Sequence, residues 1–127
     1  MVTGSCLCGA VTMRYDGPVG VITACHCGQC RKTSGHFAAS FDAEADRLDW
    51  QGLGATRSHS TPGGGRRTFC ATCGSRLWFQ ASDGAIAVEA GLIDGPSHGI
   101  LGRHIFVADK GDYYDISDGL PQSEQSE

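Results

Sequence analysis

The chain has 127 residues, of which 10 are Lys or Arg and 14 are Asp or Glu, with a net charge of −4. The basic residues are scattered singly or in short pairs, so no basic stripe could follow a phosphate backbone, and we expect no nucleic-acid partner. No apolar run approaches the roughly 18 residues that span a bilayer, and no signal segment opens the chain. We therefore expect a single cytoplasmic domain without membrane contact.

Short alternating segments separated by turn residues run through the chain. In residues 9–15, Val11, Met13 and Tyr15 share one face with polar side chains between them, which is typical of a half-buried strand. Residues 31–35 are polar and form at most one helical turn. Further strands are predicted at residues 19–24, 37–41, 48–51, 56–60, 76–80, 86–90, 101–107 and 113–116. This pattern indicates an all-β domain with little helix.

Acidic residues gather near the end of the chain. Six of the 14 acidic residues lie between Asp109 and Glu127. We interpret residues 122–127 as an acidic, disordered tail, because a short polar segment cannot bury enough apolar surface to offset the cost of ordering it.

The cysteines are the most informative residues of the chain. They fall into three clusters: Cys6 and Cys8; Cys25, Cys27 and Cys30; Cys70 and Cys73. Residues two apart on a strand point to the same side, so Cys-x-Cys aims two sulfurs at one point. The Cys-x-x-Cys spacing needs a tight turn, which a following glycine favours. In a reducing compartment such clusters are more often metal ligands than disulfides.

The count of seven divides into four and three. Two cysteine pairs can close a four-thiolate zinc site, whereas three thiolates leave an open position, as in a catalytic zinc site. Spacing alone leaves the pairing of the clusters open. His36 could also close the three-cysteine site and make it structural, or Cys27 and Cys30 could form a redox dithiol, although the βαβ context of such dithiols is missing.

Four motifs, in order along the chain, resemble the glutathione-dependent formaldehyde-activating enzyme family, whose domain is shared with centromere protein V. They are Gly-Ser-Cys-Leu-Cys-Gly-Ala-Val at residues 4–11, Cys-His-Cys-Gly-Gln-Cys-Arg-Lys at 25–32, Phe-Cys-Ala-Thr-Cys-Gly-Ser at 69–75, and the stretch from His104 to Pro121. The resemblance covers nearly the whole chain, so it assigns residues 1–121 to one zinc-binding domain of this type. A departure is Tyr113-Tyr114, where related sequences often carry a tryptophan.

The resemblance implies a β-tent of small antiparallel sheets around two zinc ions per chain. It implies a structural zinc held by four cysteines and a catalytic zinc held by three: Cys6, Cys8, Cys70 and Cys73 for the first, Cys25, Cys27 and Cys30 for the second. It also implies a carbon–sulfur lyase whose partners are a small thiol, by default glutathione, and an aldehyde, by default formaldehyde. The product of that reaction is S-(hydroxymethyl)glutathione.

Polar residues near the three-cysteine cluster are candidates for substrate binding. Arg31, Lys32 and His36 follow it directly and suit a substrate carboxylate or a proton transfer, but an exposed loop with solvated charges explains them equally well. His104 and Lys110 flank the last strand and could reach the same pocket, but a surface position is favoured for them. The pair Arg66-Arg67 is expected to be a solvated strand end rather than an anion site.

A function of another class stays open at this point. A non-catalytic zinc-binding β domain could use the same scaffold to bind a protein partner, because a fold by itself does not prove an enzyme. An enzyme requires its second zinc site to face a cleft into which polar groups converge. A binding module requires a closed second site and a large exposed apolar patch. The sequence does not determine the oligomeric state.

Overall fold

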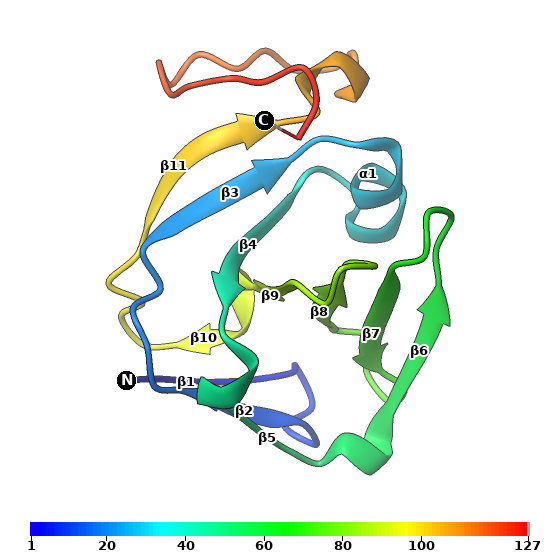
Figure 1. The fold of residues 1–127 in the computed structure, drawn as a ribbon, viewed down its shortest axis with the longest axis vertical. Coiled ribbons are helices and arrows are strands. Elements are labelled where there is room, and N and C mark those ends of the chain that lie inside the picture. Colours follow the sequence, from blue (N-terminus) through cyan, green and yellow to red (C-terminus); the bar gives the residue numbers. More distant parts are fainter. Residues whose placement is uncertain (127) are drawn as a thin grey trace.

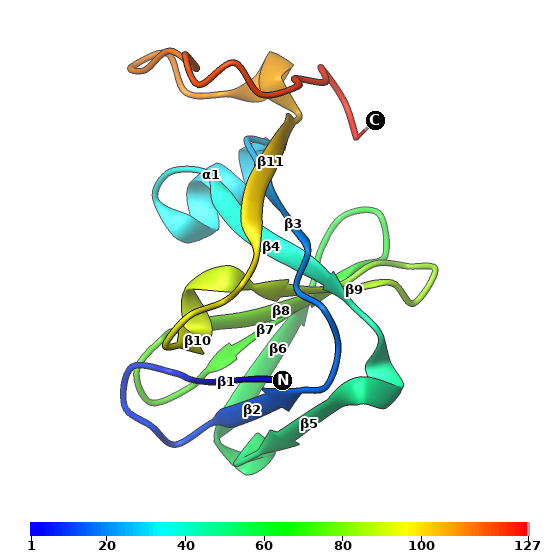
Figure 2. The ribbon, with the colours of Figure 1, turned by 90° about the vertical axis from the view of Figure 1, so that its left-hand side faces the viewer.

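The computed structural model describes residues 1–126, which form two β-sheets and one short α-helix (Figures 1 and 2). The strands are β1 Val2–Ser5, β2 Thr12–Tyr15, β3 Val21–Cys25, β4 Ala38–Ala43, β5 Leu48–Gln51, β6 Thr56–Ser60, β7 Arg66–Cys70, β8 Arg76–Gln80, β9 Ile86–Glu89, β10 Ile93–Asp94 and β11 Ile100–Ile105. The helix is α1, Gly28–Ser34, and four 3₁₀ turns lie at Ala45–Arg47, Leu53–Ala55, Ala90–Leu92 and Val107–Asp109. The predicted all-β class with little helix is confirmed.

The smaller sheet has four antiparallel strands in the order β10-β1-β2-β5. Its alternation follows the sequence, since Val11, Met13 and Tyr15 are at most 2% exposed while the residues between them face solvent. Every second side chain of a strand points to the same face, so one face of this sheet covers the core.

The larger sheet has seven strands in the order β11-β3-β4-β9-β8-β7-β6. It bends strongly, so that β11, β3 and β4 rise on one side of the molecule and β8, β7 and β6 on the other (Figure 1). Its strands pair antiparallel except for β3 and β11, which run parallel. A purely antiparallel arrangement was expected. The long connection from β3 through β10 allows the parallel pair, since a parallel strand needs a crossover.

The core lies between the two sheets. Phe41, Leu77 and Val88 of the large sheet are at most 1% exposed and share one apolar cluster with the buried face of the small sheet. Trp50 of β5 packs on Trp78 of β8, with ring centroids 4.6 Å apart. Both tryptophans therefore join the two sheets, which is the packing role that aromatic rings of this size usually have.

Helix α1 is longer than the single turn that the sequence suggested. It begins after Cys27, whose sulfur accepts a hydrogen bond from the backbone N–H of Cys30, and it ends at Gly35 in the left-handed conformation with φ 86°. The sulfur thus replaces the usual Ser or Asp cap, which a sequence rule based on oxygen caps does not detect. The helix positions the end of the middle cysteine cluster.

The C-terminal segment differs from its prediction. Residues 113–116 form no strand, whereas the chain beyond Pro121 runs along the free edge of β11. The backbone N–H of His104 donates to Pro121 O at 2.9 Å, and that of Ser123 donates to His104 O at 2.9 Å. The sheet edge offers unpaired backbone groups that this segment satisfies, so residues 122–125 are hydrogen-bonded where a disordered tail was predicted. Residue 127 lies outside the described residues.

Within the described residues, no helix combines the length and the apolar character that crossing a lipid bilayer would require.

Candidate metal centres and pocket

The first candidate metal centre brings together cysteines from two segments that are far apart in the sequence. Cys6 and Cys8 lie in the turn after β1, while Cys70 ends β7 and Cys73 lies in the turn that follows. The sulfurs of Cys6 and Cys8 are 3.6 Å apart, and those of Cys8 and Cys70 are 3.8 Å apart. A tetrahedral zinc with Zn–S bonds of about 2.3 Å separates its sulfurs by about 3.8 Å. The four cysteines therefore fit one metal ion.

Hydrogen-bond donors surround this four-cysteine cluster. Val11 N donates to the sulfur of Cys6 at 3.4 Å, and Ser75 Oγ lies 3.2 Å from the sulfur of Cys73. Hydrogen bonding by the side chain and backbone of Ser75 lowers the pKa of Cys73 to about 5. Thiolates are the metal-binding form of cysteine, so these donors favour a bound cation. Gly74, with φ 79°, makes the predicted tight turn after Cys73.

The second metal centre is local in sequence. Cys25 ends β3, Cys27 precedes α1, and Cys30 lies in the first turn of α1. Their three sulfurs lie within 4.8 Å of one another, and the cysteines of the chain are all free thiols. Hydrogen bonds from Cys25 and then Cys30 lower the pKa of Cys27 to about 2, whereas the bond to Cys27 raises the pKa of Cys25. Three convergent soft sulfurs are a ligand set that suits zinc. The division into four and three cysteines is thus present in the folded chain.

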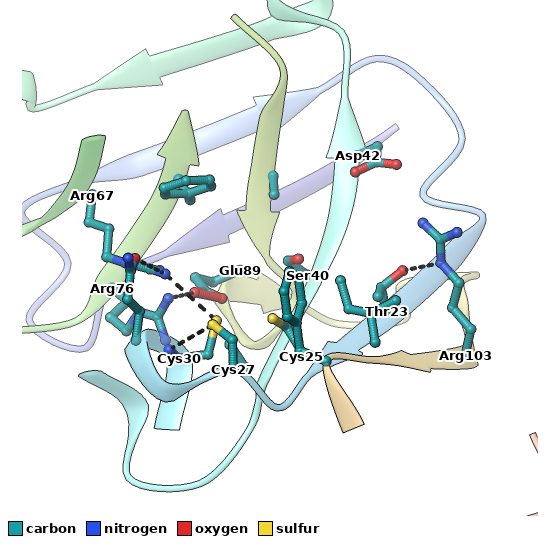
Figure 3. A pocket seen from close by; sticks show the side chains of 16 residues that line it. Thr23, Cys25, Cys27, Cys30, Ser40, Asp42, Arg67, Arg76, Glu89 and Arg103 are labelled. Atoms are coloured by element: carbon teal, nitrogen blue, oxygen red, sulfur yellow. Dashed lines mark hydrogen bonds and ion pairs between the residues drawn. The ribbon is translucent and has the colours of Figure 1, made fainter. Parts of the chain in front are cut away.

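The three-cysteine cluster opens into a pocket of about 380 Å³ (Figure 3). The lining side chains come from β3, β4, β7, β8, β9, β11 and α1, which the bend of the large sheet brings together. Besides the three cysteines, the lining includes the apolar side chains Ala38, Phe79, Ala87, Ile105 and Phe106 and the polar side chains Thr23, Gln29, Ser40, Asp42, Arg67, Arg76, Glu89 and Arg103. None of the other four cysteines lines this pocket. A concave site in which polar groups converge beside apolar side chains is typical of a small-molecule site.

Arg67, Arg76 and Glu89 form one side of the pocket next to the cysteines, which we call the charged wall. Arg76 Nη2 pairs with Glu89 Oε1 at 2.9 Å, and Arg67 lies on the same side of the pocket (Figure 3). Burial raises the pKa of Glu89, although Arg76 and then Arg67 act in the opposite direction. The prediction for Arg67 as a solvated strand end was wrong, since this side chain is only 7% exposed.

The sequence carried no local signal for this wall. Arg67 and Thr68 are both buried although successive residues of a strand point to opposite faces, so the simple alternation along β7 fails. Arg76 begins β8 and Glu89 ends β9, and the antiparallel pairing of these two strands brings their side chains together.

The opposite end of the pocket carries a second polar group. Arg103 Nε donates to Thr23 Oγ1 at 2.8 Å, across the parallel pair of β11 and β3. Asp42 on β4 and Ser40 on the same strand complete this end (Figure 3). The pocket therefore has charged groups at both ends, with the sulfur of Cys25 between them in this view.

His26 points away from the sulfurs, as its place between two extended neighbours predicts. It is 1% exposed, and its Nε2 lies 2.9 Å from Nδ1 of His104, whose Nε2 lies 2.7 Å from Asp118 Oδ2. Its Nδ1 bonds the hydroxyl of Tyr114. Burial, followed by the charge of His104, lowers the pKa of His26. This chain of hydrogen bonds ties the C-terminal segment to the loop of the three cysteines. The expected surface position of His104 was wrong.

The three predicted substrate residues lie outside the pocket lining. Arg31 and Lys32 are on α1, and His36 follows the helix with its Nδ1 2.6 Å from the hydroxyl of Tyr113. His36 is not part of the cysteine cluster, so it does not close the site. Their role in substrate binding stays a prediction.

Comparisons with known proteins identify the family of this chain. A family model described as glutathione-dependent formaldehyde-activating enzyme matches residues 1–109. A Halomonas elongata protein, provisionally named a glutathione-dependent formaldehyde-activating enzyme, is 35% identical over 86 residues, which cover 61% of this chain and 55% of that protein. The match thus spans about half of the relative's length. A crystal structure of a Rhodobacter sphaeroides protein has a TM-score of 0.63 at 20% identity, over 94% of this chain and 98% of that one, which supports the fold alone.

Proposed function

Because this chain belongs to the glutathione-dependent formaldehyde-activating enzyme family, we propose that it is a zinc-dependent carbon–sulfur lyase. Its substrate is an adduct between a small thiol and an aldehyde, with glutathione and formaldehyde as the default pair. In the direction of synthesis, the thiol sulfur bonds the aldehyde carbon, and the thiol proton ends on the aldehyde oxygen.

One observation carries this proposal: Cys25, Cys27 and Cys30 converge on a pocket of about 380 Å³. The four-cysteine cluster has a complete set of sulfurs, whereas the three-cysteine cluster has one ligand fewer and borders a space large enough for small molecules. This contrast favours an enzyme over a protein-binding module, for which the second metal site would be closed.

The cysteines would hold two zinc ions, a structural one at Cys6, Cys8, Cys70 and Cys73, and a catalytic one at Cys25, Cys27 and Cys30. Zinc bound at the second site supplies a Lewis acid that keeps a thiol in its reactive thiolate form near neutral pH. The sulfur chemistry of both donor sets fits this ion.

The pocket residues supply positioning and proton transfer. The apolar side chains of Phe79, Ile105 and Phe106 exclude water from part of the space, and the charged groups at both ends orient a polar thiol. Glu89 suits a proton carrier between the thiol and the aldehyde oxygen, because its carboxyl lines the pocket and burial raises its pKa above the ordinary value.

The reaction requires free thiols, and the chain has no disulfide among its described residues. A reducing compartment keeps both the cysteine ligands and a small thiol substrate in the required form. We therefore place the activity in the cytoplasm.

Exchange between free and adduct-bound formaldehyde tests the proposal, measured by NMR in the presence of glutathione. Wild-type protein is expected to accelerate exchange and to contain two zinc ions per chain. Cys27→Ala is expected to keep one zinc and its fold and to lose the acceleration, while Thr33→Ala on the exposed face of α1 leaves both unchanged. Acceleration that persists in Cys27→Ala rejects the proposed site, and no acceleration by zinc-loaded wild type with this thiol rejects the proposed substrates.

A further inference from the structure

We propose that Arg67 is a positioning residue of the three-cysteine site, where its guanidinium holds Cys30 and compensates part of the negative charge of the bound sulfurs. This inference rests on the proposed function only in that a divalent metal occupies Cys25, Cys27 and Cys30. Arg67 lies on β7, far from these cysteines in the sequence, and its charge would raise the affinity of the site for the metal.

The contact is direct. Arg67 Nη2 lies 3.7 Å from the sulfur of Cys30 and 3.1 Å from Oε1 of Gln29. Gln29 and Cys30 are successive residues of α1, so a single nitrogen of the guanidinium bridges the amide and the sulfur. A hydrogen-bonded group behind a metal ligand fixes the orientation of that ligand and alters its basicity.

The side chain of Arg67 is held in place from several sides. It is 7% exposed, and its guanidinium carbon lies 4.7 Å from the ring centroid of Phe79. Phe79 is also its cross-strand partner in the pairing of β7 with β8. A cation over an aromatic face is attracted by the ring, so this contact adds to the fixed position.

No carboxylate forms an ion pair with Arg67 in the described chain. Glu89 lies near enough to be influenced by its charge, but the ion pair of Glu89 is with Arg76, at 2.9 Å. A buried charge is costly unless an opposite charge compensates it. The sulfur of Cys30 is the remaining candidate among the groups that Arg67 contacts, and as a metal-bound thiolate it would supply that charge.

The net charge of the metal-loaded site explains why a nearby cation would stabilise it. Three thiolates around a divalent ion leave one net negative charge, and a thiolate substrate as fourth ligand would leave two. A buried guanidinium beside the cluster removes one negative charge in both states, so it favours metal retention and the approach of an anionic thiol.

The four-cysteine cluster offers a comparison within the same molecule. Its sulfurs accept from backbone N–H groups and contact Ser75, and among the described residues no arginine donates to them. Compensation by a buried cation is therefore specific to the cluster that faces the pocket.

The test is a metal-competition titration with a chromophoric chelator, using zinc alone as the probe. Arg67→Met removes the charge and keeps the apolar stem, and Gln29→Met removes the amide that anchors the guanidinium. The matched control is Arg66→Met, since Arg66 is the exposed neighbour on the same strand. A Cys27→Ser background, which retains only the four-cysteine site, assigns each binding phase to its cluster.

Arg67→Met is expected to weaken zinc binding at the three-cysteine site by about 10–100-fold, the usual effect of losing a group behind a metal ligand, and to leave the four-cysteine site unchanged. Gln29→Met is expected to cause a smaller loss of zinc affinity at the same site. If Arg67→Met does not fold, the zinc affinity of Gln29→Met tests the inference in its place. An affinity within twofold of wild type in the folded variants, or an equal loss at both sites, overturns the inference. A wild type that binds no more zinc than Cys27→Ser overturns the proposed metal site instead.

Discussion

The two cysteine clusters use the same ligand chemistry in different surroundings. The four-cysteine cluster connects the small sheet to the large one, with sulfurs 3.6 and 3.8 Å apart and small hydrogen-bond donors around it. The three-cysteine cluster lies at the end of one strand and the start of the only α-helix of the described chain, against a pocket with charged walls. The number of sulfurs alone therefore does not define the role of a site, because the groups around the sulfurs also decide it.

The largest expected effect is on the four-cysteine cluster. Cys70 is 0% exposed and joins β7 to the turn after β1. Because metal-binding free energy at such a site is folding free energy, Cys70→Ser is expected to cost more than about 4 kcal/mol or to prevent folding. Urea unfolding measures the loss, with Thr72→Ser in the same turn as a control. A Cys70→Ser protein as stable as wild type would remove the structural role of this cluster.

The two clusters are expected to lose their metal at different chelator strengths. The three-cysteine site has one sulfur fewer and opens to the pocket, so a mild chelator is expected to take its zinc first. The far-ultraviolet circular dichroism should stay native while the first zinc leaves and change only with the second. Simultaneous loss of both ions, or unfolding with the first, would show that the two sites do not differ in this way.

The histidine chain behind the three-cysteine loop gives a smaller effect. His26→Leu leaves His104 and Tyr114 without their buried partner, which is expected to cost about 1–3 kcal/mol of the free energy of unfolding. His59→Leu on the exposed strand β6 is the control and is expected to change stability by less than about 0.5 kcal/mol. Equal effects of the two substitutions, measured by urea unfolding, would contradict the anchoring role of His26.

The smallest expected effect is a pH dependence at the charged wall. Burial raises the pKa of Glu89 in the folded state above its ordinary value of 4.5, so the folded chain retains this proton to higher pH than the unfolded chain. The contribution of Glu89 to stability is therefore greatest below pH 4.5 and declines as the pH rises through the folded-state pKa. Glu89→Gln should remove this decline and cost about 1 kcal/mol near neutral pH by leaving Arg76 without its carboxylate. Identical slopes of unfolding free energy between pH 4 and 7 in both proteins would contradict the assignment.

The sequence predicted what depends on local spacing. Alternation located the strand that contains Met13 and Tyr15, and the short intervals between Cys25, Cys27 and Cys30 predicted the three-cysteine cluster. The pairing of Cys6 and Cys8 with Cys70 and Cys73 came from the family resemblance, because spacing alone left it open. The rest depends on long-range geometry. Arg67 is buried by contacts with Gln29 and Cys30 of α1 and with the ring of Phe79. Glu89 meets Arg76 through the pairing of β9 with β8.

The same reason explains the error at the C-terminus. Residues 122–125 are polar by composition, yet they satisfy backbone groups of β11 that no property of their own sequence reveals. His104 was likewise expected at the surface, whereas His26 and Asp118 supply hydrogen-bond partners from segments 78 and 14 residues away. Hydrogen-bond partners of this kind emerge only when the fold brings them together.

The most direct test of the two proposed zinc sites is a crystal of the zinc-loaded protein in which anomalous scattering at the zinc edge locates the metals. We expect one ion within Cys6, Cys8, Cys70 and Cys73, and a second at Cys25, Cys27 and Cys30 whose fourth ligand comes from the pocket, as solvent or an added thiol. A second ion closed by a protein side chain such as His36, or a single ion per chain, would contradict the proposed sites.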